Sequence, residues 1–219
     1  MKRSVIIAAG GVGNRMNSAI PKQFLILKDR PIIFHAIDAF IKVYPDIEVV
    51  VSLADGLIDQ WRDLNYEFDL PTKVILANGG EERFHSIQNA LAKCAGDLIA
   101  VHDAVRPLVS DETIKACFET AEVTGAAIPV LLIKSSLRRI TFDESEAVDR
   151  SLYREVQTPQ VFKANIIKMG YEQPYQATFT DDASVVEACG HDVILVDGNE
   201  ENIKITTPFD LKVAEGIFT

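Results

Sequence analysis

The sequence predicts an α/β protein in which a Rossmann-like, mostly parallel sheet carries helices on both faces. Short apolar runs rich in β-branched residues alternate with stretches of helical periodicity, which is typical of a parallel sheet. Gly-rich and charged clusters follow several of these runs, at the edge where ligands bind in open α/β sheets. The 219 residues are 47% apolar and 25% charged, so we expect a single domain over residues 1–219.

The elements follow from local signals. The expected strands are the apolar runs at residues 4–9, 47–53, 73–77, 98–102, 126–133 and 193–197. Pro31 opens the first helix, Ser110 is a good N-cap for the second, and Gly125 ends that second helix. The expected helices are residues 32–43, 111–123, 183–189 and 208–214, and another is entered near residue 86.

Residues 135–153 break the alternation and predict a β-hairpin arm. Two β-like pieces, 137–141 and 147–153, flank the polar stretch 142–146. A lone two-stranded hairpin is marginally stable in water, so we expect this arm to pack on a second subunit and to act as a dimerisation element.

The charge balance excludes some classes of partner. With 22 Lys and Arg against 32 Asp and Glu, the net charge is −10, which argues against a protein that coats nucleic acid. A small anionic ligand remains possible, because it needs only a local cluster of cations.

No stretch of the sequence predicts export or membrane insertion. The apolar run at residues 5–9 is shorter than the roughly 7–15 residues that a signal peptide needs. Cys94, Cys117 and Cys189 are far apart and form no Cys-x-x-Cys pair, so we expect buried thiols rather than a disulfide or metal site. A cytoplasmic location is therefore predicted.

A Gly-rich loop at residues 8–16 follows the first expected strand, and such loops let backbone N–H groups approach phosphates. Met16 stands where the dinucleotide fingerprint needs Gly or Ala, and no Gly-Lys-Ser/Thr follows, so neither common phosphate-binding fingerprint applies. What remains is a loop that continues to Pro21-Lys22-Gln23 and carries two cations, Arg15 and Lys22. The alternative reading is a turn with solvated charges.

Further polar clusters follow other strands or lie in predicted loops, at residues 79–86, 102–107, 158–160, 180–184 and 202–208. Each also has a purely structural reading as a cap, turn or brace. We interpret His102 as a core histidine outside the site. Lys204 lies in what reads as an apolar strand end, where a buried ammonium group requires an anionic partner.

Taken together, these motifs resemble the nucleotidyltransferases that activate sugar and polyol phosphates, and most closely the 2-C-methyl-D-erythritol 4-phosphate cytidylyltransferases. They span the whole chain in the family's order. Ribitol-5-phosphate cytidylyltransferases share the Gly-rich loop, the turn at 102–107 and the Thr-Pro-Gln at 158–160, whereas the Thr-Asp-Asp-Ala-Ser at 180–184 favours the erythritol enzymes. One segment departs from the family pattern: residues 131–139 are longer and lack an Asp, and Ser136 stands in for a Thr hydroxyl.

The resemblance implies transfer of CMP from CTP to the polyol phosphate with release of pyrophosphate, a step in the non-mevalonate isoprenoid pathway. The attacking phosphate is already an anion, so positioning and charge stabilisation are expected to dominate over general-base catalysis. Mg²⁺ is the implied cofactor, held mainly by the triphosphate rather than by the protein. Ribitol-5-phosphate cytidylyl transfer and a nucleotide-binding module without activity are the alternatives.

The resemblance also assigns residues to roles. Arg15 and Lys22 would stabilise charge on the α-phosphate and pyrophosphate, while Arg150 and Lys204 would position the attacking phosphate. The implied CTP-binding residues are Ala8, Ala9, Gly10, Gly11, Gly13, Gly80, Ser86, Asp103 and Ala104. The implied substrate-binding residues are Asp103, Arg106, Ser136, Arg150, Thr158 and Lys204. Arg150 is expected to act on the partner's site in a homodimer that exchanges arms.

Overall fold

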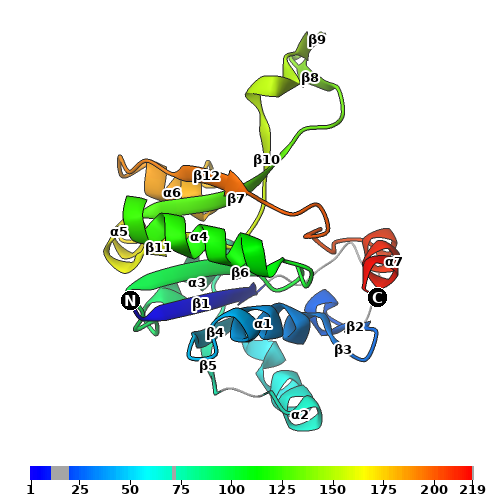
Figure 1. Cartoon of the computed structure of the whole chain (residues 1–219), viewed down its shortest axis with the longest axis vertical. Coiled ribbons are helices and arrows are strands. Elements are labelled where there is room, and N and C mark those ends of the chain that lie inside the picture. The colour runs from blue at the N-terminus through cyan, green and yellow to red at the C-terminus, as the bar shows by residue number, and fades with distance from the viewer. Residues whose placement is uncertain (11–19, 71–72, 219) are drawn as a thin grey trace.

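The computed structural model describes residues 1–10, 20–70 and 73–218, and its centre is an eight-stranded sheet (Figure 1). The strand order is β10-β7-β11-β6-β1-β4-β5, and β12 also pairs with β7. The strands of this sheet are β1 (Arg3–Ala9), β4 (Glu48–Leu53), β5 (Val74–Asn78), β6 (Leu98–Asp103), β7 (Ala126–Leu132), β10 (Arg154–Val156), β11 (Gln160–Lys163) and β12 (Ile194–Asp197).

The six predicted strands are confirmed, and the sheet is mostly parallel as expected. The pairs β1–β4, β1–β6, β4–β5 and β7–β12 are parallel. The sequence analysis missed β10 and β11, which run antiparallel to β7, with β11 also antiparallel to β6. Both are short, and Pro159 separates them, so neither produces an apolar run long enough to recognise.

Helices cover both faces of the sheet, because successive residues of each buried strand point in opposite directions. Val5 and Ile7 of β1 belong to a core cluster with α1 and α4, whereas Ile6 belongs to a second cluster with α3, α5 and α6. The helices are α1 (Ile32–Val43), α2 (Ile58–Phe68), α3 (Arg83–Leu91), α4 (Asp111–Thr124), α5 (Ala164–Gly170), α6 (Asp182–Glu187) and α7 (Pro208–Ile217). None of the helices described is long and apolar enough to cross a membrane.

The predicted helices are confirmed, and α2 and α5 are additional. Trp61 is the one buried residue of α2, and α5 has only 7 residues. Cys94 and Cys117 are buried as predicted, whereas Cys189 is partly exposed, because it follows the end of α6 at the surface.

A third, smaller core cluster fixes the segment before α7. Leu27 lies in the hairpin of β2 (Ile26–Leu27) and β3 (Arg30–Pro31), and it packs with Ile205 and Ala214. The Ile205 N–H donates to the carbonyl oxygen of Val105 at 2.9 Å. Residues 202–206 form no strand, which corrects the expectation for Lys204, but this packing still brings them to the end of β6.

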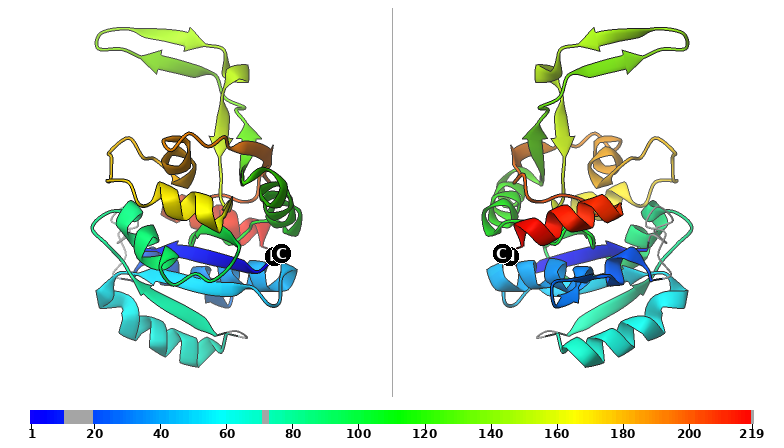
Figure 2. Two further views of the ribbon diagram at one scale, coloured as in Figure 1. Left: turned by 90° about the vertical axis from the view of Figure 1, so that its left-hand side faces the viewer. Right: turned by 90° about the vertical axis from the view of Figure 1, so that its right-hand side faces the viewer.

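The predicted arm is present and projects away from the sheet (Figures 1 and 2). Its strands β8 (Leu137–Ile140) and β9 (Ser145–Val148) form a separate antiparallel pair. The predicted second piece is wrong in its extent: Asp149 accepts a hydrogen bond from the Ser151 N–H at 2.9 Å, and a 3₁₀ turn, Arg150–Leu152, follows. Arg150 therefore lies in a turn at the base of the arm rather than in a strand.

Candidate active site

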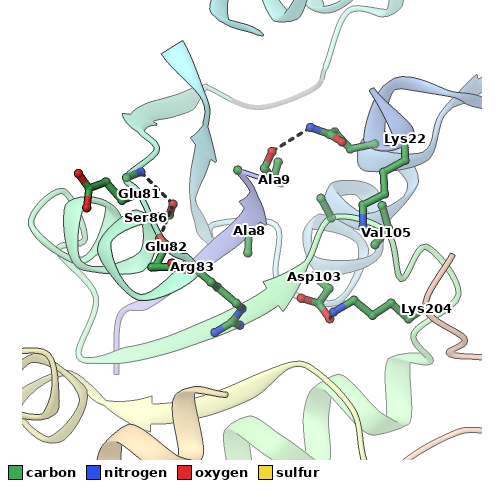
Figure 3. A pocket seen from close by; sticks show the side chains of 14 residues that line it. Ala8, Ala9, Lys22, Glu81, Glu82, Arg83, Ser86, Asp103, Val105 and Lys204 are labelled. Atoms are coloured by element: carbon green, nitrogen blue, oxygen red, sulfur yellow. Dashed lines mark hydrogen bonds and ion pairs between the residues drawn. The ribbon is translucent and has the colours of Figure 1, made fainter. Parts of the chain in front are cut away.

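A cavity of about 330 Å³ lies beyond the carboxyl ends of β1 and β6, beside the start of α3 (Figure 3). Its lining comes from five separate segments of the chain, three of which follow or end the parallel strands β1, β5 and β6. The lining residues are Ala8, Ala9, Gly10, Lys22, Gln23, Gly80, Glu81, Glu82, Arg83, Ser86, Asp103, Ala104, Val105 and Lys204.

The structure brings most of the predicted nucleotide-site residues into this cavity. Those that line it are Ala8, Ala9, Gly10, Lys22, Gly80, Ser86, Asp103, Ala104 and Lys204. Gly11, Gly13 and Arg15 lie outside the described residues. The sequence analysis did not assign Gln23, Glu81, Glu82, Arg83 and Val105, although all are neighbours of assigned residues.

Small residues shape one wall of the cavity. Ala8 lies beside Asp103 in the parallel register of β1 and β6, and the Ala104 N–H donates to the Ala8 carbonyl at 3.2 Å. A Cβ atom added to Gly10 would lie 3.1 Å from the Ser86 hydroxyl oxygen. These contacts leave the end of β1 open to a ligand and close to the start of α3.

The loop before α3 is held by Ser86 and has no room for a side chain at position 80. The Ser86 hydroxyl accepts the Gly80 N–H at 3.0 Å and donates to the Glu82 carbonyl at 3.1 Å. A Cβ atom on Gly80 would lie 2.4 Å from the Cβ of His85. Gly80 is not among the described residues with positive φ, so steric room rather than a left-handed backbone requires glycine here.

Lys22 reaches the cavity from the side opposite α3 (Figure 3). It begins a 3₁₀ turn, Lys22–Phe24, whose other two residues are buried. The Gln23 side chain donates to the Ala9 carbonyl at 2.8 Å, and Phe24 packs in the core beside α1. The segment that carries Lys22 is thus fixed to the end of β1.

Asp103, at the end of β6, is the centre of a charged cluster. Its Oδ2 lies 3.0 Å from Lys204 Nζ and 3.3 Å from Arg106 Nε. Burial alone would raise the pKa of Asp103, but Lys204, Arg83 and Arg106 outweigh burial and hold that pKa well below its ordinary value. The predicted anionic partner of Lys204 is therefore confirmed, although the Lys204 side chain is 43% exposed rather than buried.

A second cavity of about 290 Å³ adjoins the first and shares Arg83, Asp103 and Lys204 with it. Its other lining residues are Arg106, Val156, Gln157, Thr158, Gln160, Thr180 and Asp181. Hydroxyl, amide and charged groups dominate this set, which suits a ligand with hydroxyl groups and a phosphate. Four predicted substrate residues line this cavity: Asp103, Arg106, Thr158 and Lys204.

His102 and Thr158 form a buried chain of hydrogen bonds behind this second cavity. His102 is fully buried, its Nε2 lies 2.9 Å from the Arg106 carbonyl oxygen, and its Nδ1 lies 3.0 Å from Thr158 Oγ1. A carbonyl only accepts, so Nε2 carries the proton and Nδ1 accepts from Thr158, whose oxygen in turn accepts the Asp103 N–H at 3.1 Å. Burial lowers the pKa of His102 to about 4. The interpretation of His102 as a core histidine is confirmed.

Ser136 and Arg150 line neither cavity within this chain. Both are exposed at the base of the arm, where an Arg150 Nη1–H donates to the carbonyl oxygen of Lys134. Arg139 of β8 pairs with Glu146 of β9. Of the predicted site residues that the structure describes, all but the two on the arm are therefore gathered in these adjoining cavities.

Comparison with known proteins identifies the family. The family model of 2-C-methyl-D-erythritol 4-phosphate cytidylyltransferase matches residues 4–219. The chain belongs to this family. Proteins of that name from Phocaeicola vulgatus and Bacteroides fragilis are each 47% identical to it, over 98% and 99% of this chain and 99% and 100% of theirs.

Solved structures of the same family have a similar fold. The 2-C-methyl-D-erythritol 4-phosphate cytidylyltransferase of Thermus thermophilus has a TM-score of 0.80 at 31% identity, covering 99% of this chain and 98% of that one. The enzyme of Francisella tularensis has a TM-score of 0.81 at 29% identity, covering 99% of both. The family and the enzyme class predicted from the motifs are thus confirmed: the chain is a cytidylyltransferase, and the ribitol-phosphate and non-catalytic alternatives are disfavoured.

Proposed function

We propose that this cytidylyltransferase joins CTP to 2-C-methyl-D-erythritol 4-phosphate in the two adjoining cavities. A phosphate oxygen of the polyol substrate attacks the α-phosphorus of CTP, the bond to pyrophosphate breaks, and the product carries a new diphosphate link. The observation that supports this best is the shared wall of Arg83, Asp103 and Lys204. A nucleotide in one cavity and a polyol phosphate in the other would meet there.

The first cavity is assigned to CTP. Small residues at the end of β1 and the Gly80–Ser86 turn leave room for the cytosine ring and ribose. Lys22, together with Arg15, stabilises the charge that develops on the α-phosphate and pyrophosphate. This role suits Lys22, because the turn that carries it is anchored by Gln23 and the charge is preorganised.

The second cavity is assigned to the polyol phosphate. Lys204 positions the attacking phosphate, and Asp103, Arg106 and Thr158 surround the hydroxyl groups. The Thr158 hydroxyl is already bonded to His102 and to the Asp103 N–H, so Thr158 would bind through its remaining acceptor capacity. The ion pair with Asp103 keeps Lys204 in the wall that the two cavities share.

The expected Mg²⁺ fits as an ion carried by the nucleotide. Across the described ranges, no group of three or more His, Cys, Asp or Glu side chains could hold a metal ion. The three cations around Asp103 compete with a metal for its oxygens. When bound, Mg²⁺ would neutralise charge on the triphosphate and keep most of its water ligands.

The arm is assigned to a homodimer in which Arg150 and Ser136 reach the partner's second cavity. Large apolar side chains on and beside it are exposed: Ile140 by 74%, Leu152 by 78% and Phe142 completely. Exposed apolar groups of this size favour burial against another surface.

The cytoplasmic location also stays a prediction.

Pyrophosphate release tests the proposed function. The purified protein with Mg²⁺ and CTP should release pyrophosphate with 2-C-methyl-D-erythritol 4-phosphate, and far more slowly with ribitol 5-phosphate. Replacing CTP by ATP is the matched nucleotide control. Tight CTP binding without pyrophosphate release, or faster release with ribitol 5-phosphate, would contradict the proposal.

A further inference from the structure

Arg83 is a cation in the wall that the two cavities share, and the proposed function assigns it no role. It is the first residue of α3, and it lines both cavities. Figure 3 shows its side chain extending from the start of α3 toward the side of the cavity where Asp103 lies. Its side chain is 36% exposed.

A buried anchor fixes the guanidinium from behind. Arg83 Nη1 and Nη2 donate to the two carboxylate oxygens of Asp182 at 2.8 and 2.6 Å. The Tyr171 hydroxyl donates to Asp182 Oδ1 at 2.6 Å, and the Asp182 side chain is fully buried. Such a fork-to-fork pair fixes the plane of the guanidinium as well as its position.

Stability alone explains this arrangement poorly. A buried ion pair gains little over well-packed apolar residues of similar volume, because both charges lose their water. The pair also connects α3, which carries the Gly80–Ser86 turn, to α6, whose N-cap Asp181 lines the second cavity. Gln160 holds the same cap, donating to Asp181 at 2.8 Å and accepting the Ala183 N–H at 2.8 Å.

We propose that Arg83 is a further binding residue for the polyol phosphate, with its guanidinium positioned by Asp182 and Tyr171. Asp182 uses one N–H of each terminal nitrogen, and among the described residues no bond is made by the other three N–H groups of Arg83. These N–H groups donate to oxygen atoms of the polyol phosphate at the wall that the two cavities share. A lysine could not keep Asp182 and reach the substrate at once.

The inference rests on the proposed function and is tested by kinetics with both substrates. Arg83→Lys should raise the KM for 2-C-methyl-D-erythritol 4-phosphate by about 10- to 100-fold, the value of a lost hydrogen bond to a charged group. The KM for CTP should change by less than about threefold, because the nucleotide keeps its other contacts. Tyr171→Phe, which loosens the anchor without touching the cavity, should raise the same polyol KM by about two- to tenfold.

A matched control separates binding from bracing. Ile87→Val lies in the same helix, is fully buried and does not line either cavity, so it lowers the melting temperature without touching a substrate. Its KM for the polyol phosphate should stay at the wild-type value. If Arg83→Lys does not fold, the Tyr171→Phe measurement decides.

Three outcomes would contradict the inference: an unchanged polyol KM in Arg83→Lys, an unchanged polyol KM in Tyr171→Phe, or equal rises in both KM values that follow the loss of stability. A wild-type protein that releases no pyrophosphate from CTP and 2-C-methyl-D-erythritol 4-phosphate would instead contradict the proposed function. The two failures are therefore distinguishable.

Discussion

Asp103 and Arg150, both predicted to act on the substrate, lie in very different surroundings. Asp103 ends a central strand and lies within 3.3 Å of two cationic groups, Lys204 and Arg106, from elsewhere in the same chain. Arg150 lies in an exposed turn, where its side chain bonds to the Lys134 carbonyl. The cavity is organised by contacts within one chain, whereas the arm leaves Arg150 and its large apolar side chains exposed.

The difference has a physical cause. Parallel strands deliver their carboxyl ends to one edge, so side chains there gain neighbours without any further element. A hairpin outside the sheet has no such neighbours and cannot hold a side chain to the ~0.5 Å that a catalytic position demands. The arm can therefore contribute to a site only after docking on another surface.

Lys22→Ala tests the cavity side of this comparison and should have the largest effect. Turnover at saturating substrates should fall by about 10²–10³, because a preorganised charge at the leaving group is lost. Lys22→Arg should also be poor, since a planar fork does not replace a compact ammonium group. Pyrophosphate release measures both. Lys28→Gln, at an exposed turn nearby, should keep normal turnover. Near-normal turnover in Lys22→Ala would remove its assigned role.

Mixing two inactive variants tests whether Arg150 on the arm acts on the partner's site. Arg150→Ala and Lys22→Ala should each be inactive alone. If Arg150 acts in trans, subunit exchange in an equal mixture should restore about a quarter of wild-type activity, because half of the dimers then carry one intact site of two. If Arg150 acts in its own chain, both sites of every mixed dimer stay broken. No recovery, with exchange confirmed by differently tagged subunits, would refute the exchange of arms.

Gly80→Ala tests how closely the loop before α3 packs against His85 in the cavity wall. The new methyl group would meet His85 at 2.4 Å, so α3 must shift. Overpacking of this kind costs about 1–3 kcal/mol, and each kcal/mol lowers the melting temperature of a chain of this size by about 2–4 °C. The KM for CTP should rise severalfold because Ser86 moves with the helix. Gly56→Ala is the matched control, since a Cβ there meets nothing within 4 Å. Equal melting temperatures would contradict the close packing.

Most of the fold and of the nucleotide side could be predicted from the sequence, because both depend on local signals. Asp103 and Gly80 follow apolar strands, and their position at one edge follows from a parallel sheet alone. The pairing of Arg83 with Asp182 could not be predicted, since the two are 99 residues apart and meet only through the packing of α6 beside α3. The short antiparallel strands β10 and β11 are likewise fixed by pairing with distant strands. The turn that contains Arg150 is different: Asp149 caps it locally, and the sequence analysis missed that signal.

Acid stability gives the smallest and last test, at His102, a fully buried titratable group behind the second cavity. Burial lowers the pKa of His102 to about 4, below the 6.5 of an exposed histidine. The unfolded chain therefore binds a proton that the folded chain does not between these two values, and stability is lost as the pH falls through this window. From about pH 6.5 to about pH 5.5, His102 should cost the fold about 1 kcal/mol.

Urea unfolding of the wild type and of His102→Gln at both pH values measures this cost. Glutamine offers a donor and an acceptor but no proton to bind, so the variant should lose less stability than the wild type over the same interval, whatever its stability at neutral pH. The pH dependence of Asp103 does not interfere, because its pKa is held low by Lys204, Arg83 and Arg106 and it stays charged throughout. Parallel loss of stability in the two proteins would mean that His102 does not remain neutral in the fold, and that the hydrogen-bond chain through Thr158 to Asp103 has a different proton arrangement.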